Sequence, residues 1–128
     1  MKTLKTPILI IILFFINAVC LSEPIMQLAE KAENYKQTET GYVINFDLSA
    51  TAEELAQINN GVQNLSDRLT LSSTTISNNL YKCVMIVDHQ NQPEYVYKML
   101  LTIGIKGINY KNENFELIKI IEILKSYL

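Results

Sequence analysis

Histidine, cysteine and tryptophan are nearly missing from this chain of 128 residues. It has one histidine (His89), two cysteines (Cys20 and Cys83) and no tryptophan. A single histidine with no serine or cysteine nucleophile motif beside it argues against a nucleophilic enzyme, and scarce histidine and cysteine argue against a dedicated zinc site. We therefore predict that the protein is not an enzyme and has no cofactor.

Cysteine is also too scarce to cross-link the fold. Small exported domains often depend on disulfides, but a Cys20–Cys83 bond requires that both residues stay in the mature chain. If processing removes Cys20, Cys83 is the only thiol left. We then expect the domain to depend on its hydrophobic core alone.

An excess of positive charge is missing as well. The chain has 11 basic and 13 acidic residues, which are interspersed and form no basic stripe. Binding to nucleic acid, or attraction to an anionic lipid surface, is therefore disfavoured.

Residues 1–22 have the pattern of a cleavable secretory signal. Two lysines, Lys2 and Lys5, precede an apolar run from Pro7 to Val19. Export machinery reads a charged region followed by about 7–15 apolar residues, whereas a membrane-spanning helix needs roughly 20. We favour a cleaved signal over an uncleaved anchor and expect a periplasmic or secreted protein.

Cleavage after Cys20 and cleavage after Ser22 both fit, and we favour the second. Either cut leaves Pro24 near the new N-terminus, where it prevents a helix from continuing. A membrane-anchored lipoprotein with a lipidated Cys20 is the alternative. Asn17 and Val19 make it less favoured, because such signals usually have leucine and a small residue at these positions. We expect membrane contact only through the signal segment or such a lipidated cysteine.

The remaining residues predict a single small α+β domain. Residues 23–40 are expected to form a short helix or a flexible linker before the domain at 41–128. The domain begins with a half-buried strand at 42–48, where apolar and polar residues alternate. A helix follows, with Thr51 and Glu54 placed to form a capping box.

The second half of the domain predicts three strands and two helices. The apolar run Cys83–Val87 indicates a central strand buried on both faces. The next helix is expected to have Asn91 as its N-cap and a left-handed C-cap at Gly104. The expected elements are strands at 67–73, 80–88 and 105–110, that helix, and a final helix at 115–128.

This order, β-α-β-β-α-β, matches the ferredoxin-like split βαβ arrangement with an extra C-terminal helix. In topology, residues 42–110 resemble the small heavy-metal-associated domains of copper chaperones. That family carries a Met-x-Cys-x-x-Cys ligand pair after the first strand, where residues 47–52 here read Asp-Leu-Ser-Ala-Thr-Ala. Because soft metals need soft ligands, the resemblance covers topology only and does not imply metal transfer.

A different metal site would use Cys83, Met85 and His89. The first two lie two positions apart on a strand and face the same way, and His89 continues that face. Free cysteine and methionine are usually core residues, so we predict that Cys83 and Met85 pack in the core. A degenerate metal-handling domain stays as an alternative function.

Tyrosine is the aromatic residue that the chain has in number, with seven copies. Two of them flank Val96 on a predicted helix, so both cannot be buried with its apolar stripe. Exposed tyrosines give a large contact area at low entropic cost. We hypothesise a partner surface, or alternatively packing of the last helix on the sheet, for Tyr95, Tyr97, Tyr110 and Tyr127.

Small size, mild acidity and missing chemistry favour an exported protein-binding subunit, for example an accessory component of an envelope, pilus or secretion assembly. The abundance of Ile, Asn, Lys and Leu resembles proteins of low-GC bacteria. The partner is expected to be another protein. The alternative is a small secreted or periplasmic inhibitor or immunity protein that acts through the loop at Asp88–Gln92.

Overall fold

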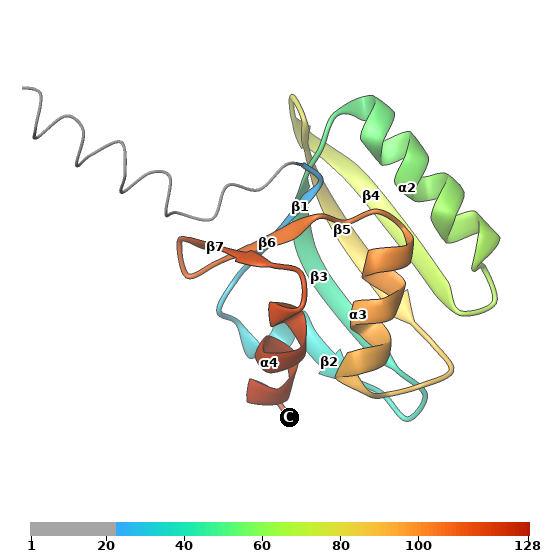
Figure 1. The fold of residues 1–128 in the computed structure, drawn as a ribbon, viewed down its shortest axis with the longest axis vertical. Helices are drawn as coiled ribbons and strands as arrows, with labels where there is room; N and C mark the ends of the chain where they lie inside the picture. Colours follow the sequence, from blue (N-terminus) through green and yellow to red (C-terminus); the bar gives the residue numbers. More distant parts are fainter. Residues whose placement is uncertain (1–22) are drawn as a thin grey trace, which may run out of the picture.

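One mixed sheet of seven strands runs through residues 23–128, the part of the chain that this computed structural model describes (Figure 1). The predicted signal segment, its predicted cleavage sites and Cys20 lie outside the described residues. The strands are β1 (Ile25–Leu28), β2 (Tyr35–Gln37), β3 (Tyr42–Ser49), β4 (Leu69–Ser77), β5 (Leu80–Val87), β6 (Gly107–Tyr110) and β7 (Glu113–Glu116). The helices are η1, a 3-10 turn (Ala32–Asn34), α2 (Ala52–Asn64), α3 (Pro93–Thr102) and α4 (Lys119–Ser126).

The α+β class is confirmed, but the strand order differs from the ferredoxin-like one. The sheet runs β4-β5-β3-β1-β6-β7, and β2 also pairs with β3. β1 therefore separates β3 from β6, which the split βαβ arrangement places side by side. Ile25 in β1 pairs with Ser49 of β3 on one side and with Gly107 of β6 on the other.

Residues 23–40 thus contribute β1 and β2 to the sheet, and the prediction of a helical or flexible linker is wrong. Met26 and Leu28 are buried, while Ile25 and Gln27 are half-buried on the other face. This alternation is that of a strand, but four residues are too few to distinguish it from helical spacing in sequence.

The helices cover one face of the sheet. α2 and α3 lie over that face, and α4 packs beside α3 (Figure 1). Alternate residues of the strands point into the resulting core, whose burial is the main stabilising term of the fold. Fully buried side chains from sheet and helices meet there, among them Tyr42, Ile44, Leu48, Met85, Ile58, Leu100, Ile120 and Leu124.

β5 is buried on one face only, so the prediction that both of its faces are buried is wrong. Cys83 and Met85 are fully buried under the helices. Val84 and Ile86 point the other way and are 36% and 46% exposed. The apolar run is continuous because β-branched residues also occupy the outward positions. It does not mean that both faces of the strand are buried.

The helix starts match the sequence in one case and not in the other. The Glu54 amide donates to the Thr51 hydroxyl at 3.1 Å and the Thr51 amide to the Glu54 carboxylate at 2.8 Å, which confirms the capping box. The N-cap of α3 is Gln92 rather than Asn91. The Asn91 side chain instead donates to the carbonyl oxygen of Glu39 at 3.2 Å.

The chain after Ile103 is also more varied than predicted. Gly104 has φ +96°, as its predicted left-handed C-cap requires. Residues 113–116 form β7 instead of the start of the last helix, because Lys111 and Asn112 both have positive φ and turn the chain back on β6. α4 is therefore shorter than the predicted helix at 115–128.

Candidate functional site

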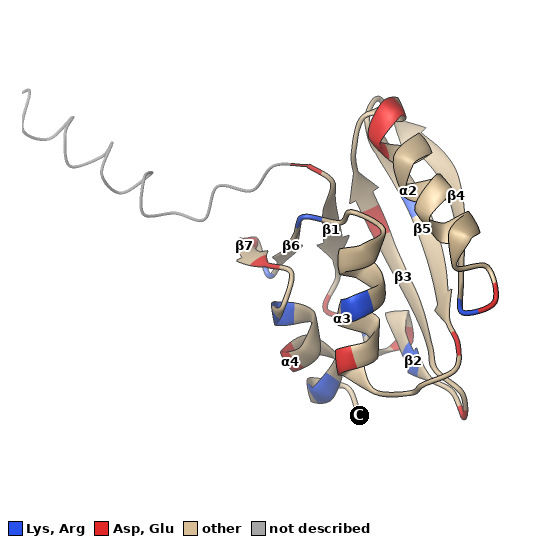
Figure 2. Cartoon of the chain, turned by 45° about the vertical axis from the view of Figure 1, so that its right-hand side comes forward, with Lys and Arg blue, Asp and Glu red and all other residues tan. Residues whose placement is uncertain are grey.

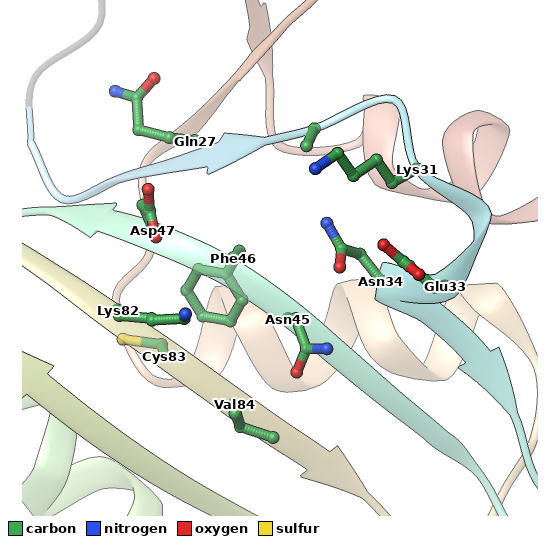
Figure 3. A pocket seen from close by; sticks show the side chains of 11 residues that line it. Gln27, Lys31, Glu33, Asn34, Asn45, Phe46, Asp47, Lys82, Cys83 and Val84 are labelled. Carbon is green, nitrogen blue, oxygen red and sulfur yellow. The ribbon is translucent and has the colours of Figure 1, made fainter.

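None of the α-helices in residues 23–128 covers the face of the sheet opposite α2 and α3. Figure 3 looks onto part of this open face, with the helices behind the strands. It carries the outward side chains of β3, β4 and β5, which the strand registers place in rows. Val84 lies between Asn45 and Ser72, and Lys82 lies between Asp47 and Thr74.

β4 is the edge of the sheet beside this face, and none of the strands in residues 23–128 pairs with its outer side. Its nine residues, Leu69–Ser77, contain no charge and no proline, and the strand is uniformly tan in Figure 2. The only irregularity in its pairing with β5 is the register shift between Thr75 and Ser77. Natural proteins usually protect a long edge with charge, proline or bulges.

The opposite edge of the sheet is protected in this way. β7 has only four residues, and Glu113 and Glu116 stand at its two ends. The two edges therefore differ in length and in charge, and β4 is the one that can accept another strand.

A second feature of the open face is a break in the strand that runs beside β3. β5 occupies one side of β3 along its whole length, so β1 and β2 share the other side. β1 pairs with Asp47–Ser49 and β2 with Tyr42–Ile44. No strand within residues 23–128 pairs with Asn45 and Phe46 on that side.

A cavity of about 390 Å³ lies at this gap, and we call it the break pocket (Figure 3). The bend at 29–34 forms one wall, and β3 and β5 form the other. Its lining is Gln27, Ala29, Lys31, Glu33, Asn34, Asn45, Phe46, Asp47, Lys82, Cys83 and Val84.

The break pocket has charged groups of both signs. Lys31 and Lys82 supply ammonium groups, and Glu33 and Asp47 supply carboxylates. None of the four belongs to an ion pair found among residues 23–128. Asp47 and Lys82 are cross-strand neighbours in the register, yet they do not form a salt bridge. The residues of this pocket were not singled out in sequence, because the gap depends on where β1 and β2 pair.

Two of the four tyrosines for which a partner surface was hypothesised lie in contact, where β6 meets the end of α4. The hydroxyls of Tyr110 and Tyr127 lie 2.9 Å apart, and Tyr110 is buried. The ring of Tyr35, which sequence reasoning missed, stacks on Tyr127 with centroids 4.6 Å apart. Tyr95 and Tyr97 are half-buried on α3, and no hydrogen bond or ring contact joins them to this group.

Two of these phenols, Tyr35 and Tyr127, are held in their neutral form. The hydrogen bond with Tyr110, together with burial, raises the pKa of Tyr127 to about 12. Burial and the neighbouring phenols also raise the pKa of Tyr35, whose hydroxyl donates to the carbonyl oxygen of Ala29. The group thus packs the N-terminal segment against β6 and α4.

Cys83 and Met85 pack in the core, as predicted. Both are fully buried, and burial raises the pKa of the Cys83 thiol to about 11. His89 lies in the exposed loop beyond β5. Residues 23–128 contain no group of three metal-ligating side chains.

The loop at Asp88–Gln92 is tied to the end of β2 and to the turn before β3. The Gln37 side chain donates to the carbonyl oxygen of Asn91 at 2.8 Å. Hydrogen bonds from Thr40 and from the His89 amide lower the pKa of Asp88. His89 itself has φ +83°, a left-handed conformation that is uncommon for residues other than glycine, although histidine adopts it more often than most.

Comparison with known proteins identifies no relative of this chain. The chain matches no protein-family model, no curated protein and no solved structure. Within the described residues, every helix is too short or too polar to cross a membrane.

Proposed function

We propose that this chain is an exported, non-enzymatic protein-binding subunit, and that its partner adds an extended segment to the outer edge of β4. An accessory role in an envelope, pilus or secretion assembly is the class that we favour. The observation that carries the proposal is the contrast between the long uncharged edge at β4 and the short acidic edge at β7.

Strand addition suits an edge of this composition. The outer side of β4 presents backbone N–H and C=O groups that an extended segment can pair with, and such pairing gives affinity without deep pockets. Thr70 and Ser72 point to the open face and can form cross-strand pairs, each worth about 0.2–1 kcal/mol. The absence of charge on β4 favours an uncharged, β-branched segment in the partner.

A variant with a charged edge tests this proposal. Thr70 and Ser72 are exposed and their side chains lie on the open face, so a Thr70→Lys/Ser72→Lys variant should fold. The tagged protein should retain a defined partner from its own envelope or culture fraction, and this variant should lose it. A Gln57→Lys/Gln63→Lys variant on the exposed side of α2 adds the same charge and should keep the partner. Equal retention by the edge variant would rule out strand addition at β4.

One observation favours the second candidate, a small inhibitor or immunity protein. His89 is held at φ +83° in an exposed loop, and hydrogen bonds join this loop to the end of β2 and to the turn before β3. Strained residues in fixed loops are often found at binding sites. In that case His89→Gly would relieve the strain but abolish inhibition of the target enzyme, whereas the charged β4 edge would have no effect.

A further inference from the structure

We propose that the break pocket binds a small zwitterionic peptide of about dipeptide length. This site is separate from the β4 edge, and its residues lie on β1, the bend at 29–34, β3 and β5.

The first argument is the place and size of the cavity. A volume of about 390 Å³ lies near the lower end of the roughly 300–1,000 Å³ that small-molecule sites occupy. The break pocket opens on the face that the helices leave uncovered, so a ligand can reach it without any movement of the core. Ala29 and Val84 give it an apolar part for a short aliphatic side chain.

The second argument is the charge pattern. The pocket has two ammonium and two carboxylate groups, and the ion pairs of residues 23–128 use none of them. A ligand with one charge could pair with the groups of only one sign, whereas a zwitterion brings one charge for each sign. Charge-assisted hydrogen bonds are about twice as strong as neutral ones, so charged ends would contribute most of the affinity.

The third argument concerns the backbone of β3. Successive residues of a strand direct their N–H and C=O groups to opposite sides. One of Asn45 and Phe46 therefore directs both groups into the gap between β1 and β2, where no strand of the described chain pairs with it. The amide of a dipeptide can pair with these groups in the way that a continuous strand would.

Side-chain amides complete the lining. Asn34 and Lys31 line the cavity from the bend, and Asn45 lines it from β3 (Figure 3). Amide side chains offer both donors and acceptors, so they can bind either end of a peptide. A free amino group, a carboxylate and one amide are therefore the ligand groups that match this pocket.

Titration of the ¹⁵N-labelled protein followed by NMR tests the inference. The probe is L-alanyl-L-alanine, and N-acetyl-L-alanyl-L-alanine amide is the uncharged control of the same backbone. We expect saturable shifts of the Asn34, Asn45 and Phe46 amides with the free dipeptide, and binding at least about tenfold weaker for the capped one. Shifts that do not saturate, or equal binding of both compounds, would overturn the proposal.

Two substitutions locate the site. Lys82→Met and Asp47→Asn each remove one charge and keep the approximate shape, and each should weaken dipeptide binding by about tenfold. Lys98→Met, on the exposed side of α3, should leave it unchanged. Unaltered affinity in both pocket variants would place any binding elsewhere and overturn the proposal. The charged β4 edge variant should bind the dipeptide normally, so the two proposals fail or succeed separately.

Discussion

The hydroxyl oxygens of Tyr110 and Tyr127 lie 2.9 Å apart and join β6 to the end of α4. Tyr35 stacks on the same Tyr127 ring. Tyr35 near the beginning of the described chain therefore meets Tyr110 and Tyr127 near its end through phenol groups, with no disulfide in residues 23–128 to hold them.

Replacing Tyr127 by phenylalanine should lower the free energy of unfolding by about 0.5–1.5 kcal/mol, because the ring stays but the hydrogen bond with Tyr110 is lost. Urea unfolding followed by circular dichroism measures the change. Tyr97→Phe is the matched control, since the Tyr97 hydroxyl has no hydrogen bond within residues 23–128, and it should have little effect. Equal stability of the Tyr127 variant and the control would contradict the role of this bond.

Alkaline pH should destabilise the protein through the same group. Tyr127 has a folded-state pKa of about 12 against an ordinary value of 10.0, so the folded state holds the proton more tightly than the unfolded one. Its contribution to stability is complete below pH 10 and is lost as the pH rises towards 12. Unfolding free energies measured across this range should fall, and less steeply in Tyr127→Phe. Ultraviolet titration in which every tyrosine ionises near pH 10 would refute this.

The Cys83 thiol should resist alkylation in the native protein. Because it is fully buried, the reagent cannot reach it. Because its pKa is raised to about 11, very little of the thiol is ionised to the reactive thiolate at pH 8. Iodoacetamide should label it in urea but react at least about 100-fold more slowly without denaturant. Mass spectrometry measures both rates. Rapid labelling of the folded protein would show that β5 opens easily or faces solvent on this side.

Removal of the capping box should weaken α2 by a predictable amount. Thr51→Ala loses the hydroxyl that accepts the Glu54 amide, and it should cost about 1 kcal/mol of stability. Thr51→Ser keeps the acceptor and should be close to wild type. If alanine and serine have the same effect, the capping bond does not contribute to stability.

Tyr42→Phe should stabilise the protein slightly, by up to about 1 kcal/mol. The Tyr42 side chain is 1% exposed, and its hydroxyl has no hydrogen-bond partner among the residues described. Phenylalanine fills the same space without a buried polar group. Thermal and urea unfolding measure the gain, and a clear loss of stability would reveal a partner for the hydroxyl.

The sequence predicted correctly those features that depend on interactions between residues close together in the chain. The capping box at Thr51 and the left-handed Gly104 were both correct, because each depends on residues within one turn. The predicted strand at 80–88 became Leu80–Val87. Burial of Cys83 and Met85 followed from their residue types.

The sequence could not predict the features that depend on pairing between strands far apart in the chain. β1 is recognisable only from its neighbours, Ser49 and Gly107, both far along the chain. The insertion of β1 changes the strand order and also creates the break pocket. The wrong prediction of the strand order and the failure to predict the pocket therefore have the same cause. β7 was missed because the turn before it contains no glycine, although Asn112 accepts positive φ readily.

The central place of β1 also bears on the timing of folding. This strand is made before both of its neighbours, and its parallel pairing with β6 must wait until residue 110 has been synthesised. Pairing over such a separation is slow, because the entropy of closing a long loop is lost before the contacts form. A chain exported as we propose would therefore stay incompletely folded through most of its synthesis, which is the state that translocation through a narrow channel requires.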